Sequence, residues 1–131
     1  MKSIVPVLVG LISAVIVIFF VELISHWMYP LPNGMDINNK LAMEEWIKTL
    51  PLGALLMVLL AWFLGAAVGG FAASHLDKEN AVRRCTVLGA VLLGATIMNL
   101  LEIPHPAWMW AGGIGVIVVG VWLGFKIKSW Q

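Results

Sequence analysis

Four long apolar runs, separated by short polar segments, constrain this chain more than any other feature of its sequence. Each run has about 20 residues or more, the length that a helix needs to cross the hydrocarbon core of a bilayer. Apolar residues make up 61 % of the 131 residues and charged residues 11 %, against about 45–50 % and about 25 % in a soluble domain. Since lipid tolerates helices but not open sheets, the sequence predicts an all-α integral membrane protein, a four-helix transmembrane bundle in the lipid bilayer.

The bundle is expected to form one domain over residues 1–131. Pro30 and Pro32 end the first span, and Pro106 suits the first turn of the fourth. The first apolar run is too long for a signal peptide and lacks a small-residue cleavage site, so we expect an uncleaved helix. The four spans are predicted at about 3–28, 51–74, 81–103 and 106–125.

The one sizeable polar stretch lies between the first two spans. Asn33-Gly34 is typical of a turn, and Asp36 suits the N-cap of a short helix over about 36–48. Apolar positions in this segment are interleaved with lysine and glutamate. We therefore expect a short amphipathic helix that lies on the membrane surface, with Trp46 at the level of the lipid headgroups.

The basic residues predict the orientation of the chain. Both termini and the loop between the second and third spans lie on one side of the membrane, and the remaining two loops on the other. The first side holds six of the eight basic residues, namely Lys2, Lys78, Arg83, Arg84, Lys126 and Lys128. The other side holds only Lys40 and Lys48. The positive-inside rule then places both termini in the cytoplasm, and we expect a bacterial inner membrane.

Small residues spaced four apart recur in the later spans and favour close helix packing in lipid. We expect GxxxG-type packing and a homo-oligomer, because self-association would bury more of so small a protein. A glycine-lined path through the oligomer is a further alternative. The first span has few small residues and is expected to be the most exposed to lipid, at least along its cytoplasmic half. The pairs are Gly65 and Gly69, Ala66 and Gly70, Ala90 and Gly94, Ala111 and Gly115, and Gly120 and Gly124.

The first span carries ionisable side chains near its outer end. Glu22 and His26 are four residues apart and share one helix face, which Tyr29 would extend. Ionisable groups within a span are costly, so each is a candidate functional residue. Deeper on the same face the residues are apolar, which argues against a continuous polar path across the membrane.

The third span carries a second polar set at a similar depth. Asn99 and Glu102 are three residues apart, and His105 follows in a Pro-His-Pro break. If the first and third spans are neighbours, the two sets form one pocket in the outer leaflet that binds a proton or a small polar ligand.

Three interpretations of this pocket compete. Glu22, His26, Glu102 and His105 have the nitrogen and oxygen ligands that zinc or another divalent metal takes. Alternatively, the groups titrate and bind a proton or a small polar ligand, in a transporter- or channel-like oligomer. In the third interpretation they satisfy one another or reach the headgroups, and the protein is a structural or accessory membrane subunit without ligand chemistry.

Other function classes are disfavoured. The net charge of +1 argues against a nucleic-acid partner. The sequence has no phosphate-binding loop, and its only nucleophile with a nearby base in the outer cluster is Ser25, which bulky residues flank, so we do not expect an enzyme. Its single cysteine, Cys85, cannot form an internal disulfide.

Overall fold

The computed structural model describes residues 4–103 and 105–129, with side chains as far as residue 127. Within these ranges the structure is helical and contains no strand. Four of the helices, all but the short α2, are long and apolar enough to cross a membrane. This confirms the all-helical prediction and indicates a multi-pass membrane protein. The helices are α1 (Val5–Met28), α2 (Lys40–Thr49), α3 (Leu52–Leu76), α4 (Ala81–Glu102) and α5 (Trp108–Ser129).

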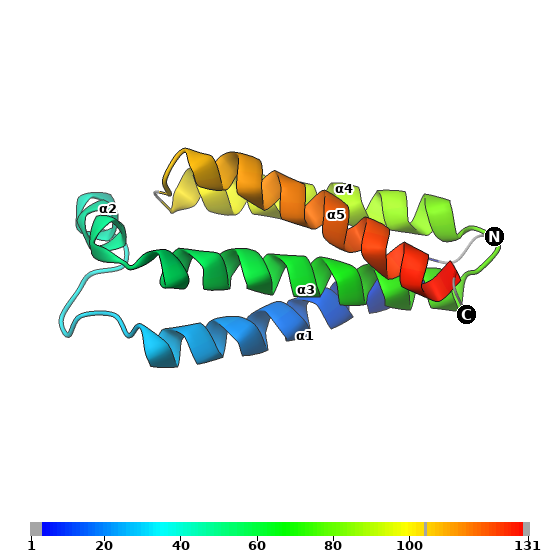
Figure 1. Ribbon diagram of the computed structural model, residues 1–131, viewed down its shortest axis with the longest axis horizontal. Coiled ribbons are helices and arrows are strands. Elements are labelled where there is room, and N and C mark those ends of the chain that lie inside the picture. Colours follow the sequence, from blue (N-terminus) through cyan, green and yellow to red (C-terminus); the bar gives the residue numbers. More distant parts are fainter. Residues whose placement is uncertain (1–3, 104, 130–131) are drawn as a thin grey trace.

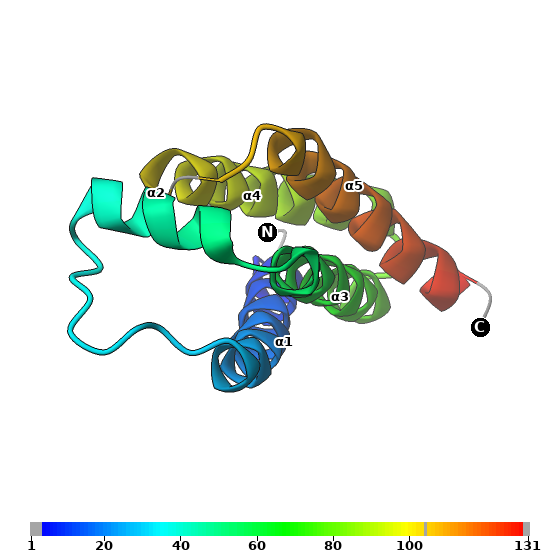
Figure 2. The ribbon, with the colours of Figure 1, turned by 60° about the vertical axis from the view of Figure 1, so that its left-hand side comes forward.

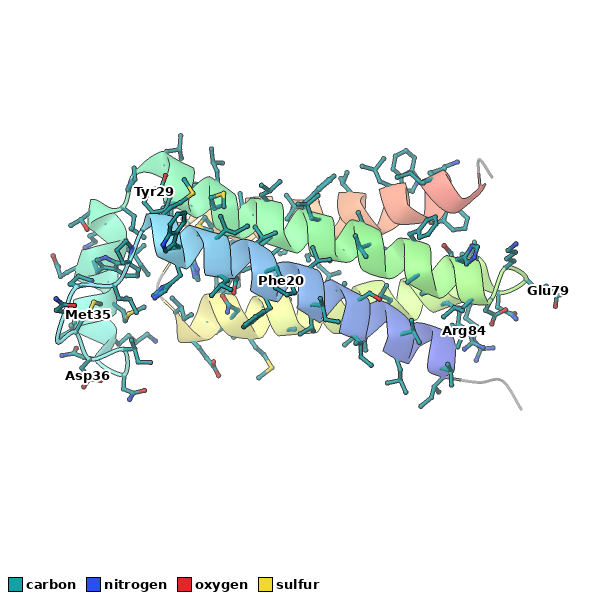
Figure 3. All side chains as sticks on the ribbon, turned by 90° about the horizontal axis from the view of Figure 1, so that it is seen from below. Phe20, Tyr29, Met35, Asp36, Glu79 and Arg84 are labelled. Atoms are coloured by element: carbon teal, nitrogen blue, oxygen red, sulfur yellow. The ribbon has the colours of Figure 1, made fainter. Side chains whose placement is uncertain are left out.

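Helix α3 is the centre of the bundle. It lies between α1 on one side and the pair α4 and α5 on the other (Figure 1). Its closest neighbours are α1 and α5, which do not contact each other over the described residues. The short α2 lies across one end of the bundle (Figure 2). Glu79 and Arg84 lie at the opposite end from Tyr29 and Asp36 (Figure 3).

The helix between the first two spans begins later than predicted. Asn39 is its N-cap, and the Asn39 side chain accepts hydrogen bonds from the amides of Leu41 and Ala42. Asp36 instead accepts a hydrogen bond from the amide of Asn38, 2.9 Å away, in the loop before the helix. The prediction that the helix starts at Asp36 is therefore wrong, because asparagine and aspartate both suit caps and local turns. The helix that forms has only 10 residues.

The loop before α2 contains the turn that the sequence predicts. The amide of Met35 donates a hydrogen bond to the carbonyl oxygen of Pro32, 3.2 Å away. Gly34 has a φ of 79°, a left-handed conformation that glycine adopts without steric cost. The turn reverses the chain between the end of α1 and the start of α2.

Helices α1 and α3 approach each other closely at small residues. A Cβ atom added to Gly69 would lie 2.8 Å from the carbonyl oxygen of Gly10, and one added to Gly10 would lie equally close to the Gly69 carbonyl. One turn further along, a Cβ atom on Gly65 would lie 2.9 Å from the carbonyl oxygen of Ala14. Backbone therefore packs on backbone at this crossing, which only small side chains permit.

Helix α5 packs against another face of α3 in a similar way. A Cβ atom added to Gly120 would lie 2.7 Å from the carbonyl oxygen of Phe63. A Cβ atom on Gly124 would collide with the carbonyl oxygen of Ala67. Helix α3 thus presents small residues to two neighbours, and this explains its central position.

Helix α1 is the least buried of the four long helices. Only 17 % of its apolar window is buried, against 39 % for α3. Its buried residues all lie in its first half, which is the half that was expected to be exposed to lipid. The small residues Gly10 and Ala14 lie in that half, whereas Phe19 and Phe20 follow and are exposed. Small residues allow close contact and large ones do not.

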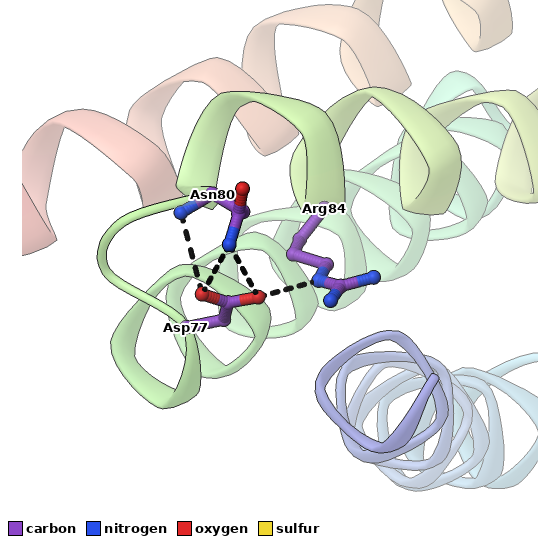
Figure 4. Close-up of polar contacts among 3 residues, drawn as sticks. All are labelled: Asp77, Asn80 and Arg84. Atoms are coloured by element: carbon purple, nitrogen blue, oxygen red, sulfur yellow. Dashed lines mark hydrogen bonds and ion pairs between the residues drawn. The ribbon is translucent and has the colours of Figure 1, made fainter. Parts of the chain in front are cut away.

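The turn between α3 and α4 is held by a largely buried ion pair (Figure 4). Nε of Arg84 lies 2.7 Å from Oδ2 of Asp77, and the two side chains are only 8 % and 18 % exposed. Asn80 donates to the same carboxylate from its amide and its side chain. The hydrogen bonds from Arg84 and Asn80 lower the pKa of Asp77 below its ordinary value of 3.8. One carboxylate therefore accepts hydrogen bonds from the loop and from the first turn of α4.

Replacing Gly69 with alanine should destabilise the protein, because the added methyl group meets the rigid backbone of α1. Overpacking of this kind costs about 1–3 kcal/mol, measured as unfolding free energy in detergent. The matched control is Gly94→Ala, since a Cβ atom at Gly94 meets nothing within 4 Å. The control should be neutral or slightly stabilising. Equal stability of G69A and G94A would contradict the close crossing of α1 and α3.

Asp77→Asn should lower the melting temperature, because it leaves the buried Arg84 without a counter-charge. The exposed Glu79 of the same loop supplies the control, Glu79→Gln, which should melt like the wild type. The contribution of Asp77 should be present above pH 3.8 and be lost as the pH falls through its lower folded pKa. A D77N melting curve identical to that of E79Q would show that the ion pair adds no stability.

Candidate functional site

A cavity of about 300 Å³ lies at the end of the bundle that α2 covers. Its wall comes from the last turns of α1, from α2, from the first turns of α3, and from the loop between α4 and α5. The volume is at the lower end of the range for small-molecule pockets. The lining residues are Glu22, Ser25, His26, Tyr29, Leu31, Met43, Trp46, Ile47, Leu50, Ala54, Leu55, Val58, Ile103 and His105.

Four of the predicted site residues line this one cavity. Glu22, His26 and Tyr29 come from α1 and its C-cap, and His105 comes from the α4–α5 loop. The spacing of Glu22 and His26 by four residues places them on one face of α1, and that face turns toward α2 and α3. Side chains far apart in the sequence therefore meet at one end of the bundle.

The other two predicted residues do not line it. Glu102 is exposed and lines a separate cavity of about 290 Å³, which it shares with Asn38 and Lys40. Asn99 lies on α4, half-buried, and its carbonyl oxygen accepts the amide of Ile103. Asn99 and Glu102 therefore do not share a cavity with His105, because their side chains leave the chain in other directions.

The predicted metal ligands are divided in the same way. Glu22, His26 and His105 line the first cavity, and Glu102 lines the second. In the parts of the chain that the structure describes, no three His, Cys, Asp or Glu side chains are grouped closely enough to hold a metal ion. The arrangement gives more support to a site for a proton or an organic ligand than to a metal site.

Tyr29 connects the end of α1 to the start of α3. Its amide donates to the carbonyl oxygen of Ser25, 2.8 Å away, and so continues the helix to its last turn. A Cβ atom added to Gly53 would lie 2.9 Å from the Tyr29 hydroxyl oxygen, so this hydroxyl rests against the α3 backbone. Tyr29 thereby closes the wall of the cavity between the two helices.

His105 presents a hydrogen-bond acceptor. Its Nδ1 lies 2.7 Å from the carbonyl oxygen of Ile103. A carbonyl oxygen can only accept, so Nδ1 carries the proton, and neutral His105 keeps a lone pair on Nε2. Burial lowers the pKa of His105 below its ordinary value of 6.5, and the bond to Ile103 opposes that shift in part. The ring also lies 6.4 Å from the buried ring of Trp62, centroid to centroid.

Several lining residues of the cavity are not among those that the sequence predicts. Trp46, which is expected at the level of the lipid headgroups, is half-buried and lines the cavity together with Met43. Ser25 also lines it, one turn before Tyr29. The apolar positions of the helix over 40–49 carry the pattern that could have identified Trp46 and Met43, because the apolar face of a short helix must cover something.

Comparison with protein-family models, with curated proteins and with solved structures found no match to this chain.

His105 should make the protein less stable in mild acid. Because its folded pKa lies below 6.5, the unfolded chain binds the proton more readily, and stability falls as the pH drops through 6.5. In His105→Asn the amide nitrogen can replace Nδ1 as donor, but the side chain no longer titrates.

Melting temperatures from pH 7.5 to 5.5 test this: H105N should lose less stability than the wild type. The control is His75→Asn, an exposed histidine at the opposite end of α3. If H105N and H75N show the same acid dependence, His105 is not the group responsible.

Proposed function

We propose that the cavity under α2 binds a small ligand with an apolar body and one cationic or hydrogen-bond-donating group, or the proton itself. The observation that carries this proposal is the convergence of Glu22, His26, Tyr29 and His105 on one cavity. A carboxylate and a neutral imidazole nitrogen both accept hydrogen bonds. A primary ammonium group donates three hydrogen bonds and carries the charge that Glu22 would pair.

The remaining wall suits the apolar body of such a ligand. Ala54, Leu55 and Val58 of α3 provide aliphatic surface, and Trp46 and Tyr29 provide aromatic rings. Aromatic faces attract cations within about 6 Å of the ring centroid. Aliphatic and aromatic walls with a few polar groups are the usual composition of small-molecule sites.

The proposed orientation places this cavity on the outer side of a bacterial inner membrane. At the end of the bundle opposite α2, the described basic residues are Lys78, Arg83, Arg84, Lys126 and Lys128. The residues Lys40 and Lys48 lie in α2. With the positive-inside rule, this distribution supports cytoplasmic termini and an α2 that lies as an amphipathic helix on the outer surface.

A homo-oligomer is part of the proposal. A Cβ atom added to Gly115, of the small-residue pair Ala111 and Gly115 in α5, would meet nothing within 4 Å. Small residues that no neighbour covers inside one protomer are suited to GxxxG-type packing between protomers. In such an assembly the cavity would belong to a transporter- or channel-like oligomer.

The alternative is a structural or accessory subunit whose polar groups only fix the helix packing. The exposed apolar surface of α1 favours it, because most of that helix is uncovered by the rest of the chain. A protein of this kind would be indifferent to small ligands.

Benzylammonium, with benzyl alcohol as its neutral counterpart, distinguishes these functions by calorimetric titration of the purified protein. We expect benzylammonium to bind more tightly than benzyl alcohol. Glu22→Gln should weaken benzylammonium about tenfold or more, the effect of losing a hydrogen bond to a charged group. The controls are Glu45→Gln, on the exposed side of α2, and Glu102→Gln, in the other cavity.

Both controls should bind like the wild type. If neither probe binds, or if both bind equally and E22Q changes nothing, the proposed pocket function is wrong and the accessory role is favoured.

A further inference from the structure

A second and larger cavity lies on the side of the bundle, between α4 and α5. It has a volume of about 500 Å³ and lies toward the end that carries the α3–α4 turn. Gly89 and Ala90 of α4 form part of its wall, and an added Cβ atom on Gly89 would come no closer than 3.9 Å to Val121 of α5. The two helices therefore leave a groove. Its lining residues are Val82, Cys85, Thr86, Gly89, Ala90, Leu93, Ile117, Val118, Val121, Trp122 and Phe125.

The groove is chemically apolar. Apart from the indole of Trp122, its side chains with polar atoms are already engaged: the Thr86 hydroxyl donates to the carbonyl oxygen of Val82, 2.8 Å away, and the Cys85 thiol donates to that of Gly70, 3.4 Å away. A polar ligand would find few partners here. A hydrocarbon chain has no polar groups, so its entry into the groove would carry no penalty for desolvating them.

The length of the groove matches one leaflet. From Val82 to Leu93 the helix rises about 17 Å, and half of the hydrocarbon core of a bilayer is about 15 Å thick. A helix of a second copy, parallel or antiparallel to α4, would be expected to contact α4 over most of its length and not only along the groove. A groove confined to one leaflet fits an acyl chain better.

Basic residues adjoin the lining residues at one end of the groove. Arg83 follows Val82, and Lys126 follows Phe125. Nζ of Lys126 lies 5.7 Å from the centroid of the Trp122 ring, and Trp122 lines the groove. Basic side chains at the membrane surface attract anionic lipid headgroups. The apolar groove, one leaflet long, is complementary to the acyl chain of an anionic lipid. The basic residues beside its end are complementary to the headgroup.

We propose that the α4–α5 groove binds an acyl chain of an anionic phospholipid, whose headgroup is held by Arg83 and Lys126. This site is independent of the cavity under α2, since the two share no lining residue.

Native mass spectrometry of the detergent-solubilised protein, titrated with phosphatidylglycerol or with phosphatidylcholine of the same chains, tests the proposal. The wild type should bind phosphatidylglycerol about tenfold more tightly, since each basic residue at the surface contributes several-fold. The double variant Arg83→Gln, Lys126→Gln should lose this preference while still binding both lipids. The double variant Lys40→Gln, Lys48→Gln, at the opposite end of the bundle, should keep it.

The acyl-chain contact is tested by Gly89→Leu, which fills the groove. It should weaken both lipids, whereas Gly94→Leu, outside the groove on the same helix, should bind them normally. Helical circular dichroism checks that each variant is folded, and the charge variants test the proposal even if G89L does not fold. Equal wild-type affinity for the two lipids would overturn the proposal, as would normal lipid binding by G89L. If G89L converts an oligomer to monomers and leaves lipid binding unchanged, the groove holds a second copy instead.

Discussion

The contact of the α3 backbone with its two neighbours is the interaction on which the rest of the structure depends. In lipid there is little hydrophobic force between helices, so association comes from close packing. Gly69 meets the backbone of α1, and Gly120 of α5 meets the backbone of α3 at Phe63. Since α1 and α5 do not contact each other in the described part of the chain, α3 sets the position of both.

The cavity under α2 forms where the close contact of α1 ends. Gly10 and Ala14 bring α1 onto α3 in its first half, and larger side chains such as Phe19 follow. Toward the other end, the Tyr29 hydroxyl rests against Gly53, so α1 stays beside α3 while space opens toward α4. The segment over 40–49 is too short to cross a membrane, and it covers this space with Met43, Trp46 and Ile47. The four polar side chains thus line one partly apolar cavity, although Glu22 and His26 are themselves exposed.

The sequence was sufficient for the four long helices and for part of the site. Apolar length and proline positions identify spans because lipid leaves few alternatives to a helix. The position of a residue along its span can also be predicted from the sequence, and this position places Glu22 and His105 at the same end of the bundle. The rotation of each helix about its own axis cannot be predicted in the same way, because packing against the neighbouring helices determines it. Glu102 therefore lies near His105 in the sequence but lines a different cavity. The cap of α2 could not be chosen either, because Asp36 and Asn39 are both good caps.

The α4–α5 groove and the cavity under α2 have a common physical origin and different chemistry. Gly120 packs directly on the α3 backbone. A Cβ atom added to Gly89, by contrast, would still lie 3.9 Å from the nearest atom of α5. Helix α5 therefore packs closely on α3, and a groove remains between α5 and α4. The groove lies within the apolar part of both helices, so its surface is hydrocarbon. The cavity under α2 lies at the helix ends, where ionisable side chains are less costly to place than in the middle of a span. A bundle in which all four helices interlocked as α3 and α5 do would have neither space.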